Sequence, residues 1–194
     1  MNRAVIIHGW EGNPNEGWMP WLKSELEKKG WEVQAPQMPH PFLPKLAEWL
    51  QTIGDLVGTP DDQIYLVGHS LGCYTILKYL ETLPENAKVG GVVLGAGFAG
   101  NLKHPIPILQ SYYKDGLNWE KIKPHSHNFV AIYSKRDDYV REESAHEFAL
   151  HLGARVIENN DWEHFSGVEG IKELPDVLNS LLEMTHPDEG ENIR

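Results

Sequence analysis

Residues 63–72 of the chain read QIYLVGHSLG, and this stretch decides the fold. Its first five residues are rich in β-formers, which is typical of a strand. Its second half is the pattern G-x-S-x-G, built from Gly68, Ser70 and Gly72. The apolar residues that follow have the i, i+3, i+4, i+7 spacing of a helix with one buried face. These residues are Cys73, Ile76, Leu77 and Leu80.

A strand, a tight turn and a helix in this order make Ser70 a candidate nucleophile. The turn holds the serine in a strained conformation above the sheet, and its neighbours Gly68 and Gly72 must lack bulk. At the helix N-terminus, the free N–H of Leu71 is placed to stabilise a developing oxyanion. The alternative is a glycine-rich turn with an incidental serine, because a bare G-x-S-x-G is common by chance.

Strands and helices alternate along the rest of the chain. We expect strands at 3–7, 31–35, 63–67, 89–94, 129–134 and 155–158. We expect helices around 20–29, from 46 to a stop at Gly54, and at 71–83, 142–152 and 174–181. Residues 100–127 are poorly periodic, with at most a short helix in 112–122. This alternation predicts one parallel sheet of about six strands with helices on both faces.

Composition restricts the class of protein. The 194 residues suit a single domain, expected over residues 1–185, followed by a frayed acidic tail at 186–194. The net charge of -11 and the lack of a Lys/Arg cluster argue against nucleic acid and anionic membranes as partners. One cysteine, no signal-peptide core and no apolar run of membrane length predict a soluble cytoplasmic protein.

Ligands of parallel sheets bind beyond the carboxyl ends of the strands, so functional residues should directly follow strands. The loop after the fifth strand contains Asp137 and Asp138, and the loop after the sixth contains His164. His164 is the only one of the ten histidines in the loop that follows the last strand. A serine nucleophile needs a base and an orienting carboxylate, and Ser, Asp, His is the chain order of α/β-hydrolases.

Four segments make the chain resemble a known family. They are AVIIHG (residues 4–9), VGHSLG (67–72), SKRDDYV (134–140) and the pair His164-Phe165. The chain is similar over nearly its whole length to the small serine α/β-hydrolases of the retinoblastoma-binding protein 9 and YdeN-like group. The resemblance implies a minimal α/β-hydrolase fold that lacks the first two strands of larger hydrolases.

The resemblance also implies roles for particular residues. Ser70 is then the nucleophile, His164 the general base and acid, and Asp137 the orienting carboxylate. Family spacing favours Asp137 over Asp138 because it places the acid three residues before a valine, here Val140. The second oxyanion donor is expected to be the N–H of Trp10, paired with that of Leu71. The implied substrate is a small-molecule carboxylic ester or thioester, with no cofactor.

The chain departs from the family at Glu163, where relatives often have glycine. This carboxylate either turns toward His164 or points to solvent. Trp10, His69 and Trp162 are expected to line the substrate pocket, although a packed side chain is an equal alternative for His69. Residues 100–127 are too short and broken for a large lid, so we expect an open pocket.

Two other classes of function remain open. The chain can be a binding or regulatory protein on a hydrolase scaffold, since fold does not imply function. A metal hydrolase is weakly supported, because no H-E-x-x-H or similar ligand spacing is present. No metal site is therefore predicted. Cys73 is disfavoured as a nucleophile because it falls on the buried face of its helix.

Overall fold

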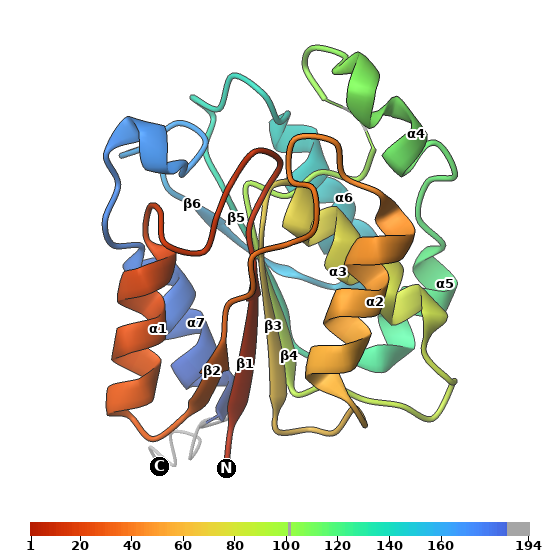
Figure 1. Cartoon of the computed structure of the whole chain (residues 1–194), viewed down its shortest axis with the longest axis vertical. Helices are drawn as coiled ribbons and strands as arrows, with labels where there is room; N and C mark the ends of the chain where they lie inside the picture. The colour runs from red at the N-terminus through yellow and green to blue at the C-terminus, as the bar shows by residue number, and fades with distance from the viewer. Residues whose placement is uncertain (101, 186–194) are drawn as a thin grey trace, which may run out of the picture.

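The computed structural model describes residues 1–100 and 102–185, so the predicted tail at 186–194 lies outside the described part. Six strands form one parallel sheet in the order β2-β1-β3-β4-β5-β6 (Figure 1), as predicted. The strands are β1 (Arg3–Ile7), β2 (Glu32–Gln34), β3 (Ile64–His69), β4 (Gly91–Gly95), β5 (Phe129–Tyr133) and β6 (Arg155–Glu158). The helices are α1 (Met19–Lys28), α2 (Leu46–Val57), α3 (Leu71–Thr82), α4 (Gln110–Tyr113), α5 (Trp119–Ile122), α6 (Glu142–Leu152) and α7 (Pro175–Thr185).

The sheet separates two hydrophobic cores. Helices α1 and α7 cover one face, and α2, α3 and α6 cover the other (Figure 1). Along β1, Val5 and Ile7 pack beneath α2 and α3, whereas Ala4 and Ile6 pack on the side of α1. Successive strand side chains point to opposite faces, so a strand covered on both sides must be apolar at every position. This is why β1 is readable in the sequence as an unbroken apolar run.

The strand order reverses between β1 and β3. The chain leaves β1 toward one edge of the sheet to form β2, and from β3 onward it proceeds toward the other edge. Loops from the adjacent carboxyl ends of β1 and β3 therefore diverge and leave a crevice between them. The G-x-S-x-G segment joins the end of β3 to the start of α3 at this crevice, beside the loop that begins at His8.

The prediction that the second helix ends at Gly54 is wrong, because α2 continues to Val57 and is capped by Gly58. Gly58 has a φ of 65°, a left-handed conformation that favours glycine and ends the helix there. A helical glycine costs about 1 kcal/mol relative to alanine. Burial of Val57, which is 1% exposed, readily offsets this cost.

The segment 100–127 holds more structure than its sequence suggests, with α4, α5 and two one-turn 3₁₀ helices among its described residues. None of the described helices has the length and apolar character needed to span a bilayer.

Candidate active site

Ser70 lies at the turn between β3 and α3 in a conformation that few residues adopt. Its φ and ψ are 52° and -117°, and its N–H donates to the Gly95 carbonyl at 2.9 Å. The flanking glycines are required by close backbone approach. A Cβ on Gly68 would lie 2.7 Å from the backbone of Cys73, and one on Gly72 would lie 2.3 Å from the Ile7 carbonyl oxygen. The sequence pattern therefore has a steric cause on both sides of the serine.

His8 fixes the peptide group that precedes Trp10. Its Nε2 accepts the Met38 N–H at 3.0 Å, so the proton is on Nδ1, which donates to the Gly9 carbonyl at 2.7 Å. Gly12 N–H donates to the same carbonyl at 3.2 Å. Carbonyl and N–H of a trans peptide point in opposite directions, so holding the Gly9 carbonyl also sets the direction of Trp10 N–H. Burial lowers the pKa of His8, which keeps the imidazole ring uncharged, so that Nε2 stays an acceptor.

Trp10 N–H and Leu71 N–H find no hydrogen-bond acceptor among the described residues. Gly9 lies directly against the serine, since a Cβ on it would be 3.1 Å from Ser70 Cβ. Leu71 is the first residue of α3, so its N–H is one of the unpaired donors at a helix N-terminus. The two free donors thus flank Ser70, one in the loop after β1 and one at the start of α3.

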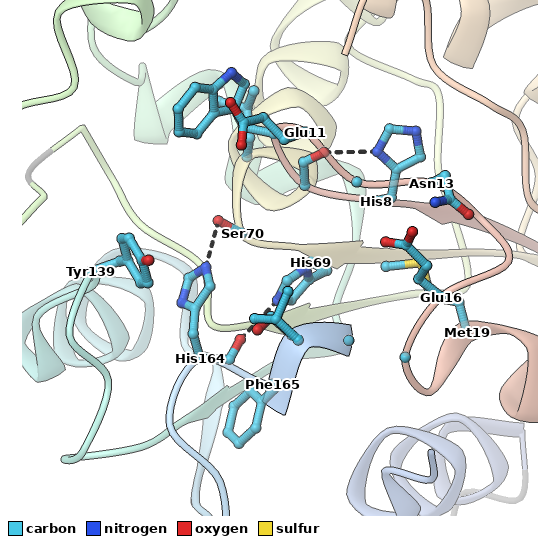
Figure 2. A pocket seen from close by; sticks show the side chains of 18 of the residues that line it. His8, Glu11, Asn13, Glu16, Met19, His69, Ser70, Tyr139, His164 and Phe165 are labelled. Atoms are coloured by element: carbon cyan, nitrogen blue, oxygen red, sulfur yellow. Dashed lines mark hydrogen bonds between the residues drawn. The ribbon is translucent and has the colours of Figure 1, made fainter. Parts of the chain in front are cut away.

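The structure brings Ser70, His164 and Asp137 into one hydrogen-bonded series. His164 Nδ1 donates to Asp137 Oδ2 at 2.7 Å. Its Nε2 lies 3.0 Å from Ser70 Oγ, the contact between His164 and Ser70 that Figure 2 shows. With the proton on Nδ1, Nε2 is free to accept the serine hydroxyl proton. These residues come from the loops after β6, β5 and β3, which all open at the carboxyl edge of the sheet.

The two adjacent aspartates have different environments. Asp137 is 2% exposed, and its Oδ1 accepts the N–H groups of Tyr139 and Val140 at 2.8 and 2.9 Å. Asp138 is exposed to solvent. The Glu163 carboxylate contacts Arg136 at 3.4 Å.

A cavity of about 300 Å³ opens beside Ser70. One part of its lining is apolar: Trp10, Phe98, Leu102, Ile106, Leu109 and Tyr139. Another part is polar and contains Glu11, Asn13 and Glu16. Figure 2 shows Tyr139 and Glu16 on opposite sides of Ser70. Because no Lys or Arg lines the cavity, its fixed charge is negative.

Two of the three expected pocket residues, Trp10 and His69, line the cavity. Trp162 does not, which corrects the expectation for this indole. Trp162 is partly buried and packs against the core on the side of α1 and α7. In place of Trp162, the wall includes Leu102, Ile106 and Leu109. These residues belong to the aperiodic segment, which carries no sequence signal for a role in the pocket.

The apolar wall is attached to the loop that carries Asp137. Leu102 forms an antiparallel bridge with Val140, and Lys103 N–H donates to the Tyr139 carbonyl at 2.8 Å. The Lys103 ammonium also donates to the Asp137 carbonyl.

Across residues 1–100 and 102–185, no group of three or more His, Cys, Asp or Glu side chains is placed to hold a metal ion.

Residues 4–183 match the family model described as serine hydrolase. The chain belongs to the serine hydrolase family. This serine hydrolase is 34% identical to YdeN of Bacillus subtilis over 93% of its own length and 96% of that protein. It is 27% identical to the serine hydrolase RBBP9 of Rattus norvegicus over 93% of this chain and 95% of the relative.

Solved structures agree with the fold. The crystal structure of the B. subtilis ydeN gene product has a TM-score of 0.87 and 33% identity, covering 95% of this chain and 99% of that one. An α/β-hydrolase enzyme from a sediment metagenome of the Mar Chica lagoon, Morocco, has a TM-score of 0.67 and 19% identity, covering 96% and 90%. The second match shows the fold alone. The family resemblance and the α/β-hydrolase fold predicted from the sequence are confirmed.

The histidine before Ser70 makes the stability of this serine hydrolase depend on pH. Burial lowers the pKa of His69 from its usual 6.5 to about 4. The unfolded chain therefore binds more protons between these two values, so stability that is full above pH 6.5 is lost as the pH falls. This one group accounts for about 3 kcal/mol of unfolding free energy across that window. The buried His8 acts in the same direction.

Urea denaturation at neutral pH and near pH 4.5 tests this linkage. His69→Gln has no ionisable group at this position, so its unfolding free energy should fall less between the two pH values than that of the wild type. Equal decreases in the two proteins would contradict the assigned pKa shift.

Proposed function

We propose that this serine hydrolase cleaves carboxylic ester or thioester bonds of small molecules through a Ser70–His164–Asp137 triad and an acyl-enzyme. The observation that carries the proposal is the 3.0 Å contact between His164 Nε2 and Ser70 Oγ, with Asp137 bound to the other ring nitrogen. A serine hydroxyl is a weak nucleophile at neutral pH, and this arrangement gives it a base of fixed orientation. The strained turn then acts as a nucleophile elbow.

In the acylation step, Ser70 Oγ attacks the substrate carbonyl carbon while His164 Nε2 takes the hydroxyl proton. The tetrahedral oxyanion accepts hydrogen bonds from Trp10 and Leu71 N–H, each such donor being worth ~10²–10³ in rate. Collapse of the intermediate breaks the bond to the leaving alkoxide or thiolate, which receives the proton from the imidazolium. Asp137 holds the ring tautomer and stabilises the imidazolium.

In deacylation, His164 removes a proton from water as the water attacks the acyl-serine. A second tetrahedral oxyanion forms at the same two N–H groups. It collapses to release the carboxylic acid, and His164 returns its proton to Ser70 Oγ. The short apolar wall formed by Phe98, Leu102, Ile106 and Leu109 suits a small or flexible acyl group.

Hydrolysis of short p-nitrophenyl esters tests the proposed function directly, with thioesters of the same acyl groups measured in parallel. We expect turnover with burst kinetics where deacylation is slow, together with covalent labelling by a fluorophosphonate probe. Folded protein that neither turns over these substrates nor takes the label would favour the alternative, a binding protein on a hydrolase scaffold.

Charge in the cavity leads to a prediction about acyl selectivity. Glu11 and Glu16 line it, and burial keeps His8 and His69 neutral. A carboxylate on the acyl chain is repelled on the order of 1 kcal/mol, so kcat/KM for a p-nitrophenyl hemisuccinate should be about fivefold below that for a neutral ester of equal length. The double variant Glu11→Gln, Glu16→Gln should bring the ratio of the two kcat/KM values closer to one.

The matched control is Glu85→Gln, Glu120→Gln, which removes the same net charge at exposed positions outside the cavity. This control should leave the ratio unchanged. The same narrowing in both double variants would assign the effect to overall charge and would contradict a local role for Glu11 and Glu16.

A further inference from the structure

The loop that carries His164 has no regular secondary structure. Residues 159–166 join β6 to a one-turn 3₁₀ helix, Gly167–Glu169. Within the loop, Phe165 has a φ of 55°, which is costly for a non-glycine residue. Neither a helix nor a sheet ladder therefore fixes the direction of the imidazole. Contacts from outside the loop must hold its main chain.

The carboxylate of Glu169 provides one set of these contacts. It accepts the N–H groups of Glu163, His164 and Ser166 at 2.6, 3.0 and 2.9 Å, and the Ser166 hydroxyl at 2.9 Å. Burial alone would raise the pKa of Glu169, but these hydrogen bonds hold it below its usual range, so the group is ionised. Capping the short helix uses only the bonds with Ser166. The bonds from Glu163 and His164 hold the loop itself.

A second contact comes from His69, which binds the carbonyl of His164, whereas Glu169 binds the N–H of that residue. His69 Nε2 donates to the His164 carbonyl at 2.8 Å (Figure 2). His69 is buried, and its ring also packs edge-on against Trp18, with centroids 6.2 Å apart. Because His69 directly precedes Ser70, one short piece of backbone carries both the serine hydroxyl and the donor that holds His164.

We propose that Glu169 and His69 are positioning residues that clamp the main chain of His164 at its N–H and its carbonyl, and so keep the imidazole aligned between Ser70 and Asp137. This inference rests on the proposed function. Glu169 does not line the cavity, so it acts on the reaction through His164 and not through the substrate. Misplacement of a reacting group by about 1 Å can cost 10²-fold in rate.

The test compares Glu169→Ala and Glu169→Gln with the control Glu163→Gln. Glu163→Gln alters a carboxylate of the same loop that contacts Arg136. Rates are expressed per active serine, counted by fluorophosphonate labelling, so that a loss of folded protein does not register as a loss of kcat. Glu169→Ala should lower kcat about 10- to 100-fold with KM unchanged, and Glu169→Gln should lower it less. Glu163→Gln should retain wild-type kcat.

The matched pair at the other contact is His69→Gln and His69→Leu. The amide introduced by His69→Gln can still donate to the His164 carbonyl, so this variant should retain most of kcat, whereas His69→Leu should lose as much as Glu169→Ala. Should Glu169→Ala fail to fold, Glu169→Gln and the His69 pair still decide the matter. Wild-type kcat per active serine in both Glu169→Gln and His69→Leu would overturn the clamp.

A readout that needs no turnover separates this inference from the proposed function. The low-field NMR resonance of the His164 Nδ1 proton reports the hydrogen bond to Asp137. It should be present in the wild type and broadened in Glu169→Gln and His69→Leu. A wild type that hydrolyses no ester would overturn the proposed function, while an unchanged resonance in both variants would overturn the clamp.

Discussion

Ser70→Ala is expected to lower kcat for ester hydrolysis by ~10⁵–10⁶-fold and to abolish fluorophosphonate labelling. The substitution removes Oγ, the atom that lies 3.0 Å from His164 Nε2, and no other described hydroxyl takes this position. Substrate binding should persist, because the cavity walls are formed by other side chains. Residual hydrolysis should reflect only the oxyanion donors and substrate orientation.

The measurement is steady-state kinetics with a p-nitrophenyl ester, together with gel detection of the fluorescent probe. Ser24→Ala, at an exposed position of α1, is the control and should match the wild type in both assays. Undiminished labelling of Ser70→Ala would reject Ser70 as the nucleophile.

Asp137→Asn is expected to lower kcat by ~10⁴-fold with the fold intact. Oδ1 of Asp137 accepts two backbone N–H groups, so an asparagine keeps its carbonyl oxygen there and turns its NH₂ toward His164. That NH₂ donates to Nδ1 and moves the imidazole proton to Nε2, which can then no longer accept the proton of Ser70.

The neighbouring substitution is the control. Asp138→Asn changes an exposed carboxylate and should leave kcat within about twofold of the wild type. Comparing kcat/KM and the melting temperature of the two variants decides between the two aspartates. A loss of rate confined to Asp138→Asn would reverse the assignment.

Much of the fold could be read from the sequence, because burial on both faces of the sheet leaves a continuous apolar run. The predicted bounds of β1, β6 and α6 agree with the structure. Those of α2 do not, because the sequence does not show which glycine adopts a positive φ, and here it is Gly58. The role of residues 102–109 in the cavity wall could not be predicted from the sequence, because long-range contacts such as the bridge between Leu102 and Val140 fix their positions.

The sequence could identify the candidate site residues that lie in loops directly after strands. Ser70, Asp137 and His164 each occupy such a loop, and of the two aspartates the resemblance selected the one that contacts His164. The tautomer of His8 could not be predicted, because it depends on Met38 N–H, which is distant in the sequence. Glu169 was missed although Ser166-x-x-Glu169 is a readable capping box. That pattern says nothing about the further bonds to Glu163 and His164.

The attachment of Leu102 and Lys103 to the loop of Asp137 bears on how this scaffold can diversify. Substitutions that reshape the pocket near residues 102–103 also shift the loop that holds Asp137. Under the proposed function, a new acyl preference gained there would therefore come with a slower chemical step. Ile106 and Leu109 lie outside this bridge and still face the cavity. Under the proposed function, substitutions at those two positions are therefore expected to change acyl preference while the contacts that hold Asp137 stay intact.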